Sequence, residues 1–232
     1  MSKFPLSGAG SLPFLEWEEA LRFVAQYCPE MPYLPELPQA NERDYLVMRP
    51  LYDLSSAQYS GSGRAELTCE SMSALIGCFK SAKLSVSIRE QVASFLSFFA
   101  NAPICKLQCV GPVTLCENML WKGEAVSSNA DAHAVVLEFY QRWFGELLLL
   151  INERKQAAIL FFDEPMLGVA PDSPAGRLRG ESALRGSLTA CKSAGIVSAI
   201  HCCAPISQAP SVLWEAEGLS FDVTPASLQV AS

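Results

Sequence analysis

A histidine and a cysteine that follow a short apolar segment are the residues of this sequence best suited to chemistry. Residues 196–200 are apolar except for one serine, and His201, Cys202 and Cys203 come directly after them. The segment is too short for an ordinary helix and follows a turn signal at 193–195, so we predict a strand. Alternate residues of a strand share a face, so His201 and Cys203 point the same way. Their imidazole and thiolate can bind one borderline-soft ion such as zinc.

A third ligand for this metal site is available from the next predicted strand. Asp222 stands near the end of a strand predicted over residues 219–223, and zinc accepts oxygen ligands as well as nitrogen and sulfur. We therefore predict a zinc site formed by His201, Cys203 and Asp222. The plainer interpretation is that the cysteines pack as small hydrophobes, because free cysteine is among the most buried residue types.

Two adjacent carboxylates follow another apolar segment. Asp163 and Glu164 come directly after residues 159–162, and Pro165 ends the strand pairing there. We expect one of the two carboxylates to point into a site, where it could bind a substrate ammonium group or steer a proton. The alternative is a pair of solvated loop acids. His133 lies in a helical pattern, and we interpret it as a packing or helix-surface histidine.

Length, charge and cysteine content limit the classes of protein to consider. The chain has 232 residues, of which 50% are hydrophobic and 18% charged, so we expect one globular domain with a large core. A net charge of −7 disfavours nucleic acid and anionic membranes as partners. The N-terminus does not read as a signal peptide, and the nine cysteines are scattered through apolar segments. We therefore expect a cytoplasmic protein with reduced thiols and a small-molecule substrate.

Short apolar segments alternate with helical patterns through most of the chain. Strands are predicted over 104–110, 157–162, 196–200 and 219–223, and helices over 16–27, 88–100, 130–154, 175–193 and 206–216, with an irregular region at 43–63. This alternation indicates an α/β fold with a parallel sheet covered by helices. Polar residues at successive strand ends favour a (β/α)8 barrel. An open doubly wound sheet would also place them there, but no glycine-rich phosphate fingerprint precedes a helix.

Five motifs in order resemble a known family, the C-terminal catalytic barrel of cobalamin-independent methionine synthase. They are Gly10-Ser11-Leu12-Pro13, Glu36 after a proline, Gly111-Pro112-Val113-Thr114, Asp163-Glu164-Pro165 and His201-x-Cys203. The family shares its superfamily with uroporphyrinogen decarboxylase and the zinc-dependent, corrinoid-linked methyltransferases. The similarity runs from about residue 4 to residue 223, nearly the whole chain.

The resemblance implies a (β/α)8 TIM-type barrel that binds homocysteine. In the family, the residues that match Ser11 and Glu36 hold the amino acid moiety of homocysteine. The residue that matches Asp163 contacts its amino group, so Asp163 is the predicted catalytic residue as well as a substrate ligand.

The resemblance also implies zinc as the cofactor. The family's His-x-Cys pair binds zinc, which here means His201 and Cys203, and Asp222 lies close to the place of a further zinc ligand. Zinc lowers the pKa of the substrate thiol so that a thiolate attacks a methyl group. The implied activity is methyl transfer to a small thiol such as homocysteine, as part of methionine biosynthesis.

Several expectations follow for the methyl donor and the assembly. The donor is methyltetrahydrofolate or a methylcorrinoid; the tryptophan that faces folate in the family is missing here, and Glu117 lies near its place. Two alternatives remain: a corrinoid-linked methyltransferase that works with a cobalamin-carrying protein, and a catalytically inactive barrel that binds a ligand. We expect residues 1–232 to form a single barrel domain that lacks the last strand–helix units. Such an open barrel exposes strand edges, which favours a homo-oligomer.

Overall fold

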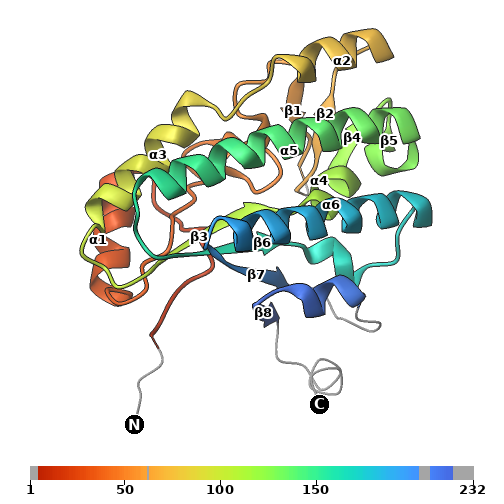
Figure 1. The fold of residues 1–232 in the computed structure, drawn as a ribbon. Coiled ribbons are helices and arrows are strands. Elements are labelled where there is room, and N and C mark those ends of the chain that lie inside the picture. The colour runs from red at the N-terminus through yellow and green to blue at the C-terminus, as the bar shows by residue number, and fades with distance from the viewer. Residues whose placement is uncertain (1–4, 62, 204–209, 222–232) are drawn as a thin grey trace.

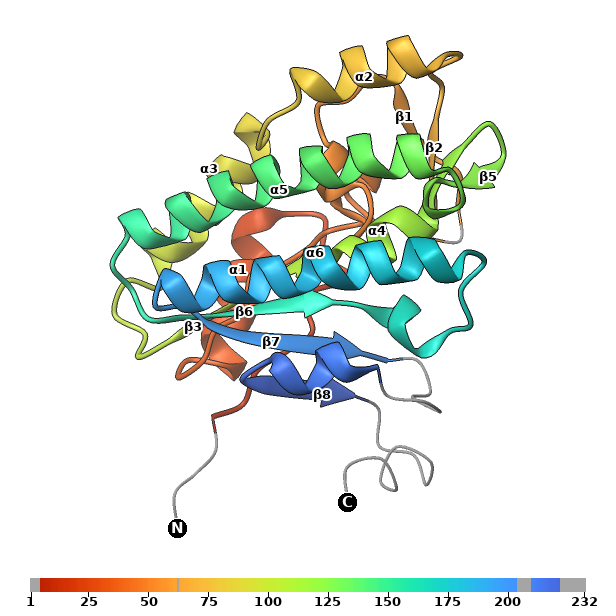
Figure 2. The ribbon, with the colours of Figure 1, turned by 45° about the vertical axis from the view of Figure 1, so that its right-hand side comes forward.

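A parallel sheet forms the centre of the molecule. The computed structural model describes residues 5–61, 63–203 and 210–221. The sheet has the order β3-β6-β7-β8, formed by β3 (Cys105–Val110), β6 (Ala158–Asp163), β7 (Val197–Cys202) and β8 (Gly218–Phe221). All three neighbouring pairs are parallel, so the strands end at the same edge, as Figure 2 shows. The four strands follow one another in the sheet in the same order as along the chain, although two strands that belong to another sheet occur between β3 and β6.

Two earlier segments extend this sheet beyond β3. Tyr33 forms an isolated parallel bridge with Lys106, and Ser11 forms one with Glu36. Each bridge is supported by backbone hydrogen bonds of 2.8–2.9 Å on either side. Prolines at 32 and 35 have no N–H to donate, which limits the hydrogen bonds that the segment around Tyr33 can form. The extended sheet therefore contains six parallel segments in sequence order.

Long helices cover one face of the sheet. The helices include α1 (Trp17–Tyr27), α3 (Val86–Phe98), α5 (Ala130–Glu153) and α6 (Pro174–Ser193). Figure 1 shows α5 and α6 running side by side along the sheet. Phe162 of β6 points toward them, because its ring lies 5.4 Å from that of Phe144 on α5. Each of these helices matches its prediction to within two residues.

A second, smaller sheet lies beside α5. It has the order β1-β2-β4-β5, with β1 (Ala57–Tyr59), β2 (Ala65–Leu67), β4 (Met119–Trp121) and β5 (Glu124–Ala125). The pair β2 and β4 is parallel, and the other pairs are antiparallel. Helix α2 (Met72–Lys80) follows β2. Strands of two or three residues are too short to leave a periodic pattern in the sequence, so this sheet was not predicted.

Two stretches differ from their predictions. The region 43–63 is not wholly irregular, since it contains the 3-10 helix η2 (Arg49–Leu51), most of the 3-10 helix η1 (Glu42–Asp44), and β1. Of the helix predicted over 206–216, the structure describes residues 210–216, which hold the 3-10 helix η5 (Ser211–Glu215). Pro210 cannot donate a backbone hydrogen bond and β8 begins at Gly218, so only a short helix fits between them.

The fold is therefore mixed α/β, with two sheets and with parallel strands that alternate with helices. The described residues form no closed barrel, because the extended sheet has two open edges within them.

The register of β6 can be tested with two adjacent phenylalanines. Phe162 is fully buried against the helices, whereas Phe161 is partly exposed on the opposite face. We expect Phe162→Ala to lower the free energy of unfolding by about 3–5 kcal/mol, as for other buried phenylalanines. The cost of Phe161→Ala should be clearly smaller, because part of its ring is already in contact with solvent. Urea unfolding of both variants measures the difference; an equal or greater loss in Phe161→Ala would contradict this register.

Candidate functional site

A pocket of about 300 Å³ lies on the face of the sheet opposite α5 and α6. The register of the parallel strands forms it: His201 pairs with Asp163 on one side and with Ser220 on the other. Paired residues share a face of the sheet, so these three polar side chains line the same wall. The complete lining is Ser7, Gly8, Ala9, Met31, Lys106, Phe161, Asp163, His201 and Ser220.

The two neighbouring carboxylates at the end of β6 have different surroundings. Asp163 is partly exposed in the pocket. Glu164 is fully buried, and its two carboxylate oxygens accept hydrogen bonds from the backbone N–H groups of Val113 (3.0 Å) and Thr114 (2.7 Å). These N–H groups lie in the first turn of α4 (Pro112–Asn118). Of the pair, Asp163 is therefore the one that faces a site, and Glu164 caps a helix.

This cap explains why two of the sequence motifs occur together. A Cβ atom at Gly111 would overlap the carboxylate of Glu164, so only glycine lets the two segments approach this closely. In return, the hydroxyl of Thr114 accepts a hydrogen bond of 3.2 Å from the backbone N–H of Met166. The Gly-Pro-Val-Thr and Asp-Glu-Pro motifs thus hold the ends of β3 and β6 against each other.

Ser11 and Glu36 contact each other at the edge of the extended sheet. The Ser11 hydroxyl donates to Glu36 Oε2 at 3.4 Å. Glu36 is buried, and its Oε1 accepts no hydrogen bond from the described residues, although Arg49 Nε lies 3.8 Å from it. Burial raises the pKa of Glu36, and the charge of Arg49 opposes that rise. A buried acceptor with spare capacity is suited to a donor brought by a ligand.

The turn before Ser11 requires glycine. Gly10 has φ +114°, which side chains rarely adopt, and a Cβ atom there would overlap the amide of Gln108. The Gln108 amide nitrogen donates a hydrogen bond of 2.6 Å to the Leu34 carbonyl. The close approach of Gly10 to Gln108 fixes the position at which Ser11 contacts Glu36.

Lys106 is a site residue that the sequence did not indicate. It lies in β3 among apolar neighbours, and its Nζ donates to the Gly8 carbonyl at 2.5 Å and lies 4.5 Å from the centre of the Phe161 ring. Burial lowers its pKa, while the charges of Asp163 and Glu36 act in the opposite direction. A lone lysine inside a buried strand is the signal that could have revealed it.

The carboxylates interact electrostatically across the site. Burial raises the pKa of Asp163 well above its ordinary value, and the nearby charges of Glu36 and Glu164 add to that rise, while Lys106 opposes it. Glu36 and Ser11 do not line the pocket, but Glu36 is close enough to influence Asp163. The site thus holds more acidic than basic groups and is suited to a positively charged ligand group.

The predicted zinc ligands are only partly described. His201 Nδ1 lies 3.0 Å from the Ser220 hydroxyl, and Cys203 is exposed directly after β7. Cys202 is buried on the helix-facing side. Asp222 lies outside the described residues. Imidazole and thiolate suit zinc, but the described ranges contain no group of three side chains that could hold a metal ion.

His133 is a packing residue. It is fully buried on α5, and Arg179 Nε donates to its Nδ1 at 3.1 Å. Burial lowers its pKa to about 4, and the charge of Arg179 adds to this effect. His133 is therefore neutral at physiological pH and lies apart from the pocket lining.

Comparisons with known proteins give no relative for this chain. No protein-family model matches it, and neither curated proteins nor solved structures provide a match. Within the described ranges, no helix is long and apolar enough to cross a membrane.

The buried carboxylate of Glu164 gives a testable pH dependence. Burial raises its pKa to about 7, although the hydrogen bonds from Thr114 and Val113 oppose the rise. Between about pH 5 and pH 7 the unfolded chain has lost the Glu164 proton while the folded chain retains it, so this residue's contribution to stability falls as pH rises. The fall should be about 2 kcal/mol over this range, from about 1.4 kcal/mol per pH unit.

Urea unfolding of wild type and Glu164→Gln at several pH values between about 5 and 7 isolates the contribution of Glu164 to stability. We expect a flatter pH profile in Glu164→Gln, which cannot titrate at this position. Glu66→Gln, at an exposed position of β2, is the matched control and should keep the wild-type slope. Parallel profiles in wild type and Glu164→Gln would contradict the raised pKa.

Proposed function

We propose that this chain is a (β/α) barrel of the methionine synthase type that binds a small amino acid thiol and methylates it. The observation that carries the proposal is the pocket lined by Lys106 of β3 and by Asp163 and His201, which are paired between β6 and β7. The six parallel segments of the extended sheet support the barrel assignment, because they follow one another in sequence order, as the strands of such a barrel do.

The charges of the site fit a zwitterionic amino acid. In the proposal, the Asp163 carboxylate binds the ammonium group, and the nearby charge of Glu36 adds to the negative potential at Asp163. Lys106 supplies the positive charge for the carboxylate of the ligand. A cation beside Asp163 lowers its pKa, so a neutral Asp163 carboxyl would release its proton when the ammonium group binds.

The methyl transfer depends on the thiol being ionised. A zinc ion held by His201, Cys203 and Asp222 would lower the pKa of the substrate thiol. This part of the proposal needs a third ligand from outside the described residues, for which Asp222 is the candidate. The role of the described residues is to bind and orient the amino acid so that its side chain points along the wall that carries His201.

A second function, a barrel that binds an amino acid without catalysing a reaction, is favoured by one observation. The charged side chains that line the pocket, Asp163 and Lys106, are by themselves complementary to an amino acid. Binding through Asp163 and Lys106 would not require the metal. Ligand binding and methyl transfer must therefore be measured separately.

Titration calorimetry with L-homocysteine tests the binding step. We expect Asp163→Asn to weaken binding about ten- to a hundredfold, because a hydrogen bond to a charged group contributes about 1.5–3 kcal/mol. Asp131→Asn, an exposed position in the first turn of α5, should bind like wild type. Absence of binding to the wild type, or equal loss in both variants, would overturn the proposed ligand.

Formation of methionine from homocysteine then tests catalysis with each donor. Turnover with methyltetrahydrofolate supports a methionine synthase-like reaction, whereas turnover with methylcobalamin alone supports the corrinoid-linked alternative. Binding without turnover of either donor would replace methyl transfer by the ligand-binding function.

A further inference from the structure

Two free cysteines lie in contact outside the candidate site. Cys69 follows β2 and Cys78 lies on α2, and their sulfur atoms are 3.2 Å apart. We propose that Cys69 and Cys78 are a thiol–disulfide site that a small disulfide such as glutathione disulfide oxidises reversibly. This inference is independent of the proposed methyl transfer.

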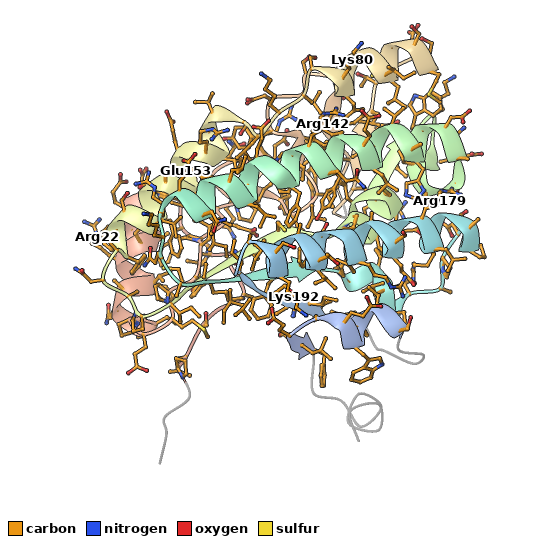
Figure 3. The ribbon with its side chains drawn as sticks, viewed as in Figure 1. Arg22, Lys80, Arg142, Glu153, Arg179 and Lys192 are labelled. Carbon is orange, nitrogen blue, oxygen red and sulfur yellow. The ribbon has the colours of Figure 1, made fainter. Side chains whose placement is uncertain are left out.

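The two cysteines are held in place by separate contacts. The carbonyl of Cys69 accepts a hydrogen bond of 2.7 Å from the indole N–H of Trp121 on β4. On the other side, Arg142 of α5, labelled in Figure 3, donates to the carbonyl of Phe79 at 2.8 Å, next to Cys78. Sulfur atoms in a disulfide are about 2.05 Å apart, so the bond requires a movement of only about 1 Å.

Burial of Phe79 holds α2 in position. Its side chain is almost completely buried, and its ring lies 5.0 Å from that of Phe139 on α5. The N-terminus of the helix is capped by Ser71, whose hydroxyl accepts from the backbone N–H of Ala74 at 3.2 Å. Cys78 is therefore presented from a fixed helix, which favours a specific pairing over random oxidation.

The two thiols differ in access. Cys69 is buried, whereas Cys78 is partly exposed and lines a pocket of about 320 Å³. Lys83 and Asp53 line the same pocket, so charges of both signs lie near Cys78 and neither excludes a peptide disulfide. Burial and the contact with Cys78 raise the pKa of Cys69, so Cys69 is the poorer first nucleophile. Cys78 is thus the attacking residue and Cys69 the resolving residue.

The reaction balances with glutathione disulfide as the oxidant. The Cys78 thiolate, after loss of its proton to solvent, attacks one sulfur of glutathione disulfide and releases one glutathione as a thiolate, which takes up a proton. The Cys69 thiol then loses its proton, attacks the Cys78 sulfur and releases the second glutathione. Two protein thiols are oxidised to one disulfide, and one glutathione disulfide is reduced to two glutathione molecules.

The test is incubation of the folded, full-length chain with glutathione disulfide, followed by acid quenching, alkylation and peptide mapping by mass spectrometry. We expect a peptide cross-linked between Cys69 and Cys78 that disappears when dithiothreitol is added. In Cys69→Ser the glutathione should stay attached to Cys78, because the resolving thiol is absent. In Cys78→Ser, Cys69 should remain largely unmodified.

Cys28→Ser is the matched control, since Cys28 is another buried cysteine outside the pair. It should form the Cys69–Cys78 cross-link as wild type does. Circular dichroism of each variant establishes that it is folded. A wild-type protein that shows no cross-link, or that shows it only after addition of denaturant, would overturn the proposal, as would equal modification of Cys69 in Cys78→Ser.

Discussion

The hydrogen bonds of Glu164 to the first turn of α4 are the interaction on which the rest of the site depends. A fully buried carboxylate is costly unless its oxygens are hydrogen-bonded, and here both oxygens accept backbone N–H groups. The same bonds satisfy two N–H groups that have no partner within α4. Removal of the carboxylate would leave the backbone N–H groups of Val113 and Thr114 without this partner. The ends of β3 and β6 are thus fixed relative to each other.

The position of Asp163 follows from this cap. Successive strand residues point to opposite faces, so when Glu164 is directed toward α4, Asp163 is directed into the pocket. The register of β6 with β7 then places His201 beside Asp163, and that of β7 with β8 adds Ser220. One buried interaction and the regular spacing of a parallel sheet are sufficient to assemble the pocket wall.

The acidic groups of the site are only partly balanced by positive charges, and this imbalance determines which ligand groups it favours. Glu36, Asp163 and Glu164 each have a pKa raised mainly by burial. Lys106 and Arg49 oppose this effect only in part. Such a site gains stability when a cation enters it, because a nearby positive charge favours the ionised carboxylate. This is the physical reason to expect an ammonium group as part of the ligand.

The long elements were predictable from the sequence, whereas the contacts between distant segments were not. Helices such as α5 have an apolar pattern over many turns, and β3 and β6 are apolar enough to be recognised. The three-residue strands carry no such pattern. Lys106 looks like an isolated charge until the fold brings it close enough to Asp163 and Glu36 to interact with their charges. The role of Glu164 depends on Gly111, more than fifty residues earlier in the sequence.

Metal content of the purified chain, measured without added metal, tests most directly the claim that the end of β7 delivers His201 and Cys203 to a zinc ion. We expect about one zinc per chain, as in a mononuclear site. The metal should be lost in His201→Ala and Cys203→Ser and retained in Cys202→Ser, whose side chain is buried on the other face of the sheet. A wild-type chain without zinc, or one that loses it equally in Cys202→Ser, would contradict the metal site and leave amino acid binding as the function of the pocket.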